Sequence, residues 1–157
     1  MFLFEKYQGD VNGIPGHANS FYINDILKGE LKFEGFVVSD WEDIKRLYTR
    51  DKVAESPEEA VRMAVLAGLD MSMVPYDYSF LDICIDLVKN KKDQKFASRV
   101  DDAVLRILKV KEKLGLWSNA SLYPVPEELV KFDSEDSFKK NLEAAHESII
   151  LGKFLKK

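Results

Sequence analysis

The chain has 157 residues, of which 46% are hydrophobic and 32% are charged, a balance that predicts one folded domain rather than a disordered segment. Its formal net charge of −4 argues against a nucleic-acid partner, which would require a basic face. The apolar runs all fall short of the roughly 20 residues that a membrane-spanning helix needs, so no membrane partner is expected.

Cys84 is the only cysteine, so an internal disulfide is excluded, and its place in a helical apolar pattern predicts a buried thiol. The first residues, Met1 to Phe4, are apolar but are followed at once by Glu5, which argues against a secretory signal. We expect a strand there instead, and the sequence leaves the cellular compartment open.

The first half of the chain contains two candidate strands and one clear helix. Asn19 or Ser20 can cap a helix that runs to about Gly29, after a loop rich in turn residues. The apolar, β-branched run from Gly35 to Ser39 is typical of a strand buried on both faces in a parallel sheet. In order, the predicted elements are a strand at 2–4, a loop at 12–16, a helix at 19–29, a strand at 35–39 and a polar helix or loop at 40–50.

The second half begins with a strong helix signal. Ser56 is a cap, Pro57 suits the first turn, and Glu59 completes a capping box. Gly68 is expected to end this helix. The predicted elements that follow are a short buried strand at 69–74, an amphipathic helix at 80–88, a polar break at 89–95, a helix at 98–114, a surface loop at 117–126 and a helix at 135–150.

This alternation of strands and helices predicts an α/β fold with a parallel sheet. In such sheets the catalytic groups lie just past the carboxyl ends of the strands. Asp40 and Trp41 stand at this position after the strand at 35–39. An aspartate after a strand is also a common helix cap or loop residue, so position alone does not make Asp40 catalytic.

Five segments of the chain resemble glycoside hydrolase family 3, the group of β-glucosidases and exo-β-glucanases. They follow one another in the family's order and at the family's spacing, and together they cover most of the chain. The matching segments are 11–19, 35–41, 67–73, 99–108 and 111–117.

The resemblance implies part of a (β/α)8 TIM barrel followed by a helical connector. Residues 1–117 would form about the last three βα units of the barrel, and residues 118–157 would lead toward a second domain outside the chain. A complete barrel takes about 250 residues, so its first strands would also lie outside the chain.

The resemblance also assigns roles to three residues. Asp40 matches the nucleophile of a reaction that cleaves β-glycosidic bonds with retention, which needs two carboxyl groups about 5 to 5.5 Å apart. Trp41 matches a residue that stacks on the sugar, and Met73 a wall of the glucose subsite. From the residue types alone, both side chains are also common in protein cores.

Other polar residues are weaker candidates. Asp70 is expected to be a structural acid in its strand rather than the acid/base, and Asp43 is expected to belong, with its neighbour Glu42, to a solvated helix start. His17 is expected to cap the following helix, or else to line the mouth of the site, and His146 is expected on the surface.

The sequence predicts neither a metal site nor a cofactor. None of its acidic, histidine or cysteine residues has metal-ligand spacing, and no glycine-rich loop suits a phosphate. An aldolase-like barrel would need a Schiff-base lysine at a strand end, and neither core strand has one. In the β-glucosidase branch of the family, the acid/base comes from the second domain.

Two hypotheses for function remain open. The first is a fragment of a retaining β-glycosidase that acts on β-glucosides or β-glucan oligosaccharides and carries the nucleophile without the acid/base. The second is a non-catalytic piece that assembles with another chain or binds sugar weakly. Either way, the open strand edges of an incomplete barrel predict self-association.

Overall fold

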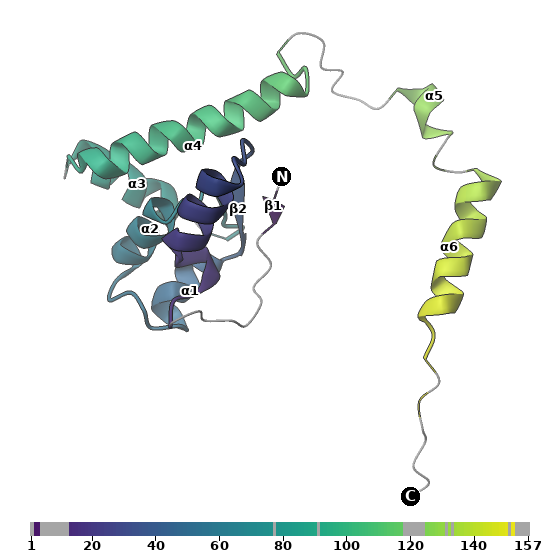
Figure 1. The fold of residues 1–157 in the computed structure, drawn as a ribbon, viewed down its shortest axis with the longest axis horizontal. Helices are drawn as coiled ribbons and strands as arrows, with labels where there is room; N and C mark the ends of the chain where they lie inside the picture. Colours follow the sequence, from purple (N-terminus) through teal and green to yellow (C-terminus); the bar gives the residue numbers. More distant parts are fainter. Residues whose placement is uncertain are drawn as a thin grey trace, which may run out of the picture. The chain divides into compact units, whose positions relative to one another are not determined.

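The computed structural model describes residues 2–3, 13–76, 78–90, 92–117, 125–130, 132, 134–150 and 152. The chain divides into two compact units, unit 1 (residues 1–116) and unit 2 (residues 117–157). Figure 1 shows their helices and strands. Unit 1 contains β1 (Phe2–Leu3), η1 (Gly16–Ala18), η2 (Phe21–Glu30), β2 (Val37–Trp41), α1 (Asp43–Thr49), α2 (Pro57–Leu66), β3 (Met71–Met73), α3 (Ser79–Lys89) and α4 (Gln94–Lys113).

The strands form a three-stranded parallel sheet in the order β1-β2-β3. Phe2 pairs with Val37, and Val38 pairs with Met71. An irregularity then shifts the register, so that Trp41 pairs with Met73. The α/β class and the parallel pairing are therefore confirmed. β2 extends past the predicted strand at 35–39, because the pairing with β3 continues through Trp41.

The core of unit 1 lies between β2 and the helices α1, α2 and α4. Its members are apolar side chains from every one of these elements, joined by η2, α3 and the segments that flank α2 and β3. Fully or almost fully buried are Ile23, Val37, Ile44, Leu47, Ala54, Ala60, Val61, Ala64, Val65, Leu69, Leu87 and Phe96.

Two predicted helix caps are present, with one difference. Asn19 accepts a hydrogen bond from the Phe21 N–H at 3.1 Å at the start of η2. This element is a π-helix, in which backbone hydrogen bonds join residues five apart. Ser56 accepts one from the Glu59 N–H at 3.1 Å, as a capping box requires. The Glu59 carboxylate, however, accepts from the Glu55 N–H at 2.6 Å, one residue before the cap.

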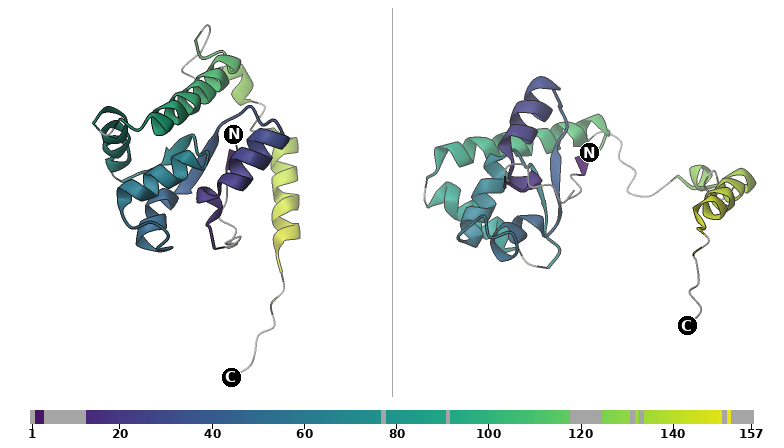
Figure 2. Two further views of the ribbon diagram at one scale, coloured as in Figure 1. Left: turned by 60° about the vertical axis from the view of Figure 1, so that its left-hand side comes forward. Right: turned by 60° about the horizontal axis from the view of Figure 1, so that its bottom comes forward.

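The predicted start of the helix after the polar break at 89–95 is wrong. Helix α4 begins at Gln94 rather than near Ser98. Asp93 caps this helix by accepting a hydrogen bond from the Phe96 N–H at 3.0 Å, and it pairs with Arg62 at 2.8 Å. These two contacts, the backbone hydrogen bond first, lower the pKa of Asp93. Figure 2 shows α4 as one continuous helix from two further sides.

Helix α3 agrees with the predicted helix at 80–88. Cys84 lies on it half-buried, and burial raises the pKa of its thiol to about 11. The thiolate that reactive cysteines need is therefore disfavoured at neutral pH.

Unit 2 contains α5 (Pro126–Leu129) and α6 (Glu135–Ser148). Ser134 caps α6 by accepting from the Ser137 N–H at 3.2 Å. The loop predicted at 117–126 falls mostly outside the described residues, and α5 already begins at Pro126. None of the helices in the described parts of either unit is long and apolar enough to span a membrane.

We expect Gly68→Ala to destabilise unit 1 strongly. Gly68 ends α2 with φ +113°, and an added Cβ would lie 2.5 Å from both Asn24 Oδ1 and Ile23 Cγ2. Backbone strain and overpacking together should cost about 2–5 kcal/mol in urea unfolding. Gly115→Ala is the control, because Gly115 has φ +73° with open space around it, and strain alone should cost about 1–2 kcal/mol. Equal losses in the two variants would contradict this account.

We also expect the chain to self-associate through an apolar surface on unit 1, the β3 patch. It consists of the exposed Met71, Leu81 and Val104, which line a cavity of about 190 Å³ together with Cys84 and Val100. Light scattering should show an apparent mass that rises with protein concentration. The double variant Leu81→Lys/Val104→Lys should reduce this rise. Leu31→Lys, at an exposed leucine outside the patch, is the control. A monomer at all concentrations would contradict the prediction.

Candidate active site

The structure brings the three predicted site residues to one edge of the sheet. Asp40 and Trp41 end β2, and Met73 ends β3, where it pairs with Trp41. Two hydrogen bonds fix this junction: the Met73 N–H donates to Ser39 Oγ at 2.9 Å, and the Glu42 N–H donates to the Met73 carbonyl at 2.9 Å. Because the strands are parallel, their carboxyl ends meet here.

The carboxylate of Asp40 is half-buried and held in one direction. Its Oδ1 accepts a hydrogen bond from the Trp41 N–H at 2.7 Å. Within the part of the chain that the structure describes, no lysine or arginine is close enough to form an ion pair with it. Asp40 therefore has the form of an oriented, accessible carboxylate rather than half of an ordinary surface salt bridge.

Trp41 lies on the surface beside a second aromatic residue. Its side chain is 46% exposed, so it is not a core aromatic. Its ring meets that of Tyr76 edge to face, with centroids 5.8 Å apart and planes at 77°. Tyr76 was not among the residues predicted for the site. The available signal was an aromatic residue directly after Pro75, just past the end of β3.

The expectation that Asp43 belongs to a solvated helix start is wrong. Asp43 is completely buried, and its Oδ1 accepts a hydrogen bond from Arg46 at 3.0 Å. Glu42 before it is partly exposed and lies 3.9 Å from Lys45. The polar run in the sequence hid this difference, because Asp43 turns inward at the first position of α1 while the side chains of Glu42 and Lys45 remain partly exposed.

The expectation that His17 caps the following helix is wrong. His17 lies buried in η1, with its Nδ1 3.9 Å from Oδ2 of Asp43, and Asn19 provides the cap instead. His146 is exposed on α6, as predicted.

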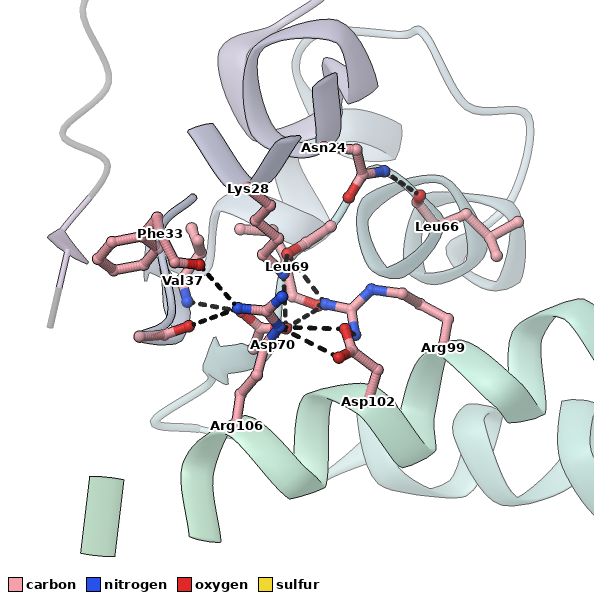
Figure 3. A network of polar contacts seen from close by, with 12 residues as sticks. Asn24, Lys28, Phe33, Val37, Leu66, Leu69, Asp70, Arg99, Asp102 and Arg106 are labelled. Atoms are coloured by element: carbon pink, nitrogen blue, oxygen red, sulfur yellow. Dashed lines mark hydrogen bonds and ion pairs between the residues drawn. The ribbon is translucent and has the colours of Figure 1, made fainter. Parts of the chain in front are cut away.

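Asp70 lies in the interior, away from the strand ends. Its side chain is 0% exposed and accepts hydrogen bonds from Lys28 Nζ at 2.8 Å, from the Val37 N–H at 2.7 Å and from Arg99. These contacts fit a structural acid. Figure 3 shows Arg99 reaching from α4 to this carboxylate and Arg106, on the same helix, reaching to the carbonyl of Phe33.

Lys28 and Arg99, together with Arg106, extend a polar network around Asp70. Arg99 also bonds the carbonyls of Gly68 and Leu69 at 3.0 Å, and Arg106 bonds those of Phe33 and Gly35 at 3.0 Å. Lys28 donates to the Gly68 carbonyl at 2.6 Å. Burial lowers the pKa of Lys28, and this effect outweighs the hydrogen bond that Lys28 donates to Asp70, which would raise it.

A cavity of about 160 Å³ lies beside α1, near the carboxyl ends of β2 and β3. It is mostly apolar, and Glu42 and Val74 at its rim are neighbours of the site residues. The cavity is lined by Glu42, Ile44, Lys45, Tyr48, Thr49, Pro57, Val61, Val74, Ser79, Phe80 and Ile83. In the described residues, no three histidine, cysteine or acidic side chains are grouped as a metal site.

In α/β enzymes the catalytic residues lie at the carboxyl ends of parallel strands, which is where Asp40 and Trp41 stand. Residues 4–110 match the model of the glycosyl hydrolase family 3 N terminal domain. The chain is 47% identical over 118 residues to a lysosomal beta glucosidase of Dictyostelium discoideum, which covers 75% of this chain. The chain therefore belongs to glycosyl hydrolase family 3.

Solved structures agree with this assignment. A β-glucosidase from Listeria innocua covers 88% of the chain with a TM-score of 0.74 and 26% identity. A β-glucosidase involved in saponin metabolism from intestinal bacteria covers 83% with a TM-score of 0.71 and 33% identity. The chain spans only 14% of the Dictyostelium relative and 18% and 17% of these two structures.

We expect Asp70→Asn to destabilise unit 1 far more than Asp102→Asn. The first change leaves Lys28 and Arg99 buried without their carboxylate and should cost about 3–5 kcal/mol in urea unfolding. Asp102 also pairs with Arg99, but it is 44% exposed, so its loss should cost about 1 kcal/mol or less. Similar losses in the two variants would show that Asp70 is not the centre of the network.

Proposed function

We propose that this chain forms part of the catalytic barrel of a retaining β-glycosidase, with Asp40 as its nucleophile. The observation that carries the proposal is the meeting of Asp40, Trp41 and Met73 at one sheet edge in a chain of this family. On this proposal, residues 1–117 are about the last three βα units of a (β/α)8 barrel, and residues 118–157 are a connector.

The chemistry requires an ionised carboxylate aimed at the anomeric carbon of the sugar. One oxygen of Asp40 forms the bond to that carbon as the glycosidic bond breaks, and water later releases the sugar with retention. The hydrogen bond from the Trp41 N–H holds Oδ1, which fixes the rotation of the carboxylate. A nucleophile held in this way loses little orientational freedom when the substrate binds.

The sugar itself would be recognised by the side chains beside Asp40. Trp41 offers an exposed indole on which a pyranose ring can stack, and Tyr76 supports it edge to face. Met73, half-buried at the end of β3, would form an apolar wall of the glucose subsite.

The acid/base is proposed to come from outside this chain. Of the acidic residues next to Trp41, Asp43 is buried against Arg46, and Glu42 lies 3.9 Å from Lys45. Without general acid catalysis, which is typically worth about 10²- to 10⁴-fold, the leaving oxygen is not protonated. We therefore propose that the chain alone has little or no hydrolytic activity.

The proposed substrates are β-glucosides or β-glucan oligosaccharides. The Listeria innocua β-glucosidase has been solved in complex with glucose, with isofagomine and, as a mutant, with laminaribiose. Another relative, 37% identical over 150 residues, is a Formosa agariphila beta-xylosidase, so a β-xyloside is the competing substrate to test.

The nucleophile can be tested without the acid/base, by using a leaving group that needs no protonation. A 2-fluoro-β-glucoside with a dinitrophenyl leaving group should label Asp40 covalently, and mass spectrometry of the digested chain should locate the label. The p-nitrophenyl β-glucoside should give no measurable turnover, because the departure of p-nitrophenol depends more on a general acid than the departure of dinitrophenol does.

Asp40→Asn is the matched control and should abolish labelling, whereas Asp51→Asn should not. Labelling at another carboxylate would overturn the role of Asp40. Robust turnover that Asp40→Asn abolishes would instead show that this chain also holds the acid/base. The corresponding xyloside, run in parallel, tests the choice of sugar.

A second candidate function is favoured by the β3 patch, which leaves apolar side chains exposed next to an edge strand. On this view the chain is a non-catalytic assembly piece. Self-association together with absent labelling of Asp40 would favour this function over the first.

A further inference from the structure

The turn that joins β2 to α1 is held by a polar cluster in which His17 and Asp43 are buried and Arg46 is partly exposed. We infer that His17, Asp43 and Arg46 are positioning residues, which fix the direction in which the side chains of Asp40 and Trp41 project at the end of β2. The catalytic roles of Asp40 and Trp41 rest on the proposed function. The fixed conformation of the turn does not, because it is a property of the chain without substrate.

The first observation is the backbone of Glu42, the residue between Trp41 and the cluster. It adopts the left-handed conformation, with φ 55° and ψ 18°, which is uncommon for residues other than glycine. Its backbone is held on both sides: the N–H donates to the Met73 carbonyl at 2.9 Å, and the carbonyl accepts from the Arg46 N–H at 3.2 Å. Such strain persists only where the surroundings fix it, and it gathers at functional sites.

The second observation is the carboxylate that follows. Asp43 is completely buried, and each of its oxygens faces a different element. Oδ1 accepts from Arg46 on α1 at 3.0 Å, and Oδ2 lies 3.9 Å from Nδ1 of His17 on η1. Oδ2 accepts no hydrogen bond from the described residues, and the imidazole of His17 is the group placed on that side.

These two observations explain how the turn is fixed. Asp43 connects the start of α1 to η1, a segment from much earlier in the chain, while Glu42 connects it to the end of β3. Rotating the turn would separate Asp43 from His17 or break the bond from Glu42 to Met73. Trp41 and Asp40 directly precede Glu42, so the same constraints set where their side chains project.

A purely stabilising cluster would behave differently. Its loss would lower the free energy of unfolding but leave the native position of Trp41 unchanged. A positioning cluster, once disturbed, changes the surroundings of Trp41 in molecules that are still folded. An apolar side chain at residue 43 could fill the space, but it could not make directed contacts to two elements.

The test reads the environment of Trp41 by fluorescence. The chain has two tryptophans, and Trp117→Phe leaves Trp41 as the sole indole in an otherwise full-length chain. In this background, Asp43→Asn and His17→Gln should shift the emission to longer wavelength and raise the acrylamide quenching constant under native conditions. Arg46→Gln should do the same, and its side chain is 36% exposed, so it carries the test if the buried variants fail to fold.

Asp93→Asn is the matched control. It removes a helix cap and an ion pair elsewhere in unit 1, so it should lower stability without moving the Trp41 spectrum. Unchanged Trp41 emission and quenching in folded variants of the cluster would overturn the inference and leave a stabilising role. Absence of covalent labelling at Asp40 would count against the proposed function alone, because the fluorescence result does not depend on catalysis.

Discussion

The buried carboxylate of Asp70 is the interaction on which the rest of unit 1 depends. It accepts from Lys28 on η2, from the backbone of Val37 on β2 and from Arg99 on α4, while its own backbone leads into β3. An acid removed from water is costly unless its partners are well placed, so the network specifies one arrangement of four elements. This arrangement accompanies the pairing of Val38 with Met71, and the irregularity that follows along β2 then places Trp41 opposite Met73.

The site and the network lie at opposite ends of the same strands. Asp70 joins the strands where they begin, close to Val37, and the candidate site occupies the edge where they end. This division separates stability from chemistry, as is general for parallel α/β proteins with their catalytic residues at the carboxyl edge. It also explains why the two aspartates have such different surroundings: Asp70 meets two cations, whereas Asp40 accepts a hydrogen bond from the backbone N–H of Trp41.

Much of this could be predicted from the sequence. Hydrophobic period located β2, α2 and α3, and the resemblance to the family selected Asp40, Trp41 and Met73, which the structure brings together. Three features could not be predicted from local pattern. The inward turn of Asp43 depends on the unusual backbone of Glu42, the burial of His17 depends on packing against α1, and the contact of Tyr76 with Trp41 joins two strand ends. The early start of α4 was missed for a local reason, since Asp93 was counted with a polar break instead of as a cap.

The order in which the partners of Asp70 are synthesised has a consequence for folding. Lys28 and Val37 precede Asp70 along the chain, but Arg99 follows it on a long helix. Until α4 has emerged from the ribosome, β3 can dock on β2 only while Asp70 has Lys28 as a partner but still lacks Arg99. We therefore expect stable closure of the sheet to follow the synthesis of α4, because this helix supplies Arg99, the second cation that binds Asp70.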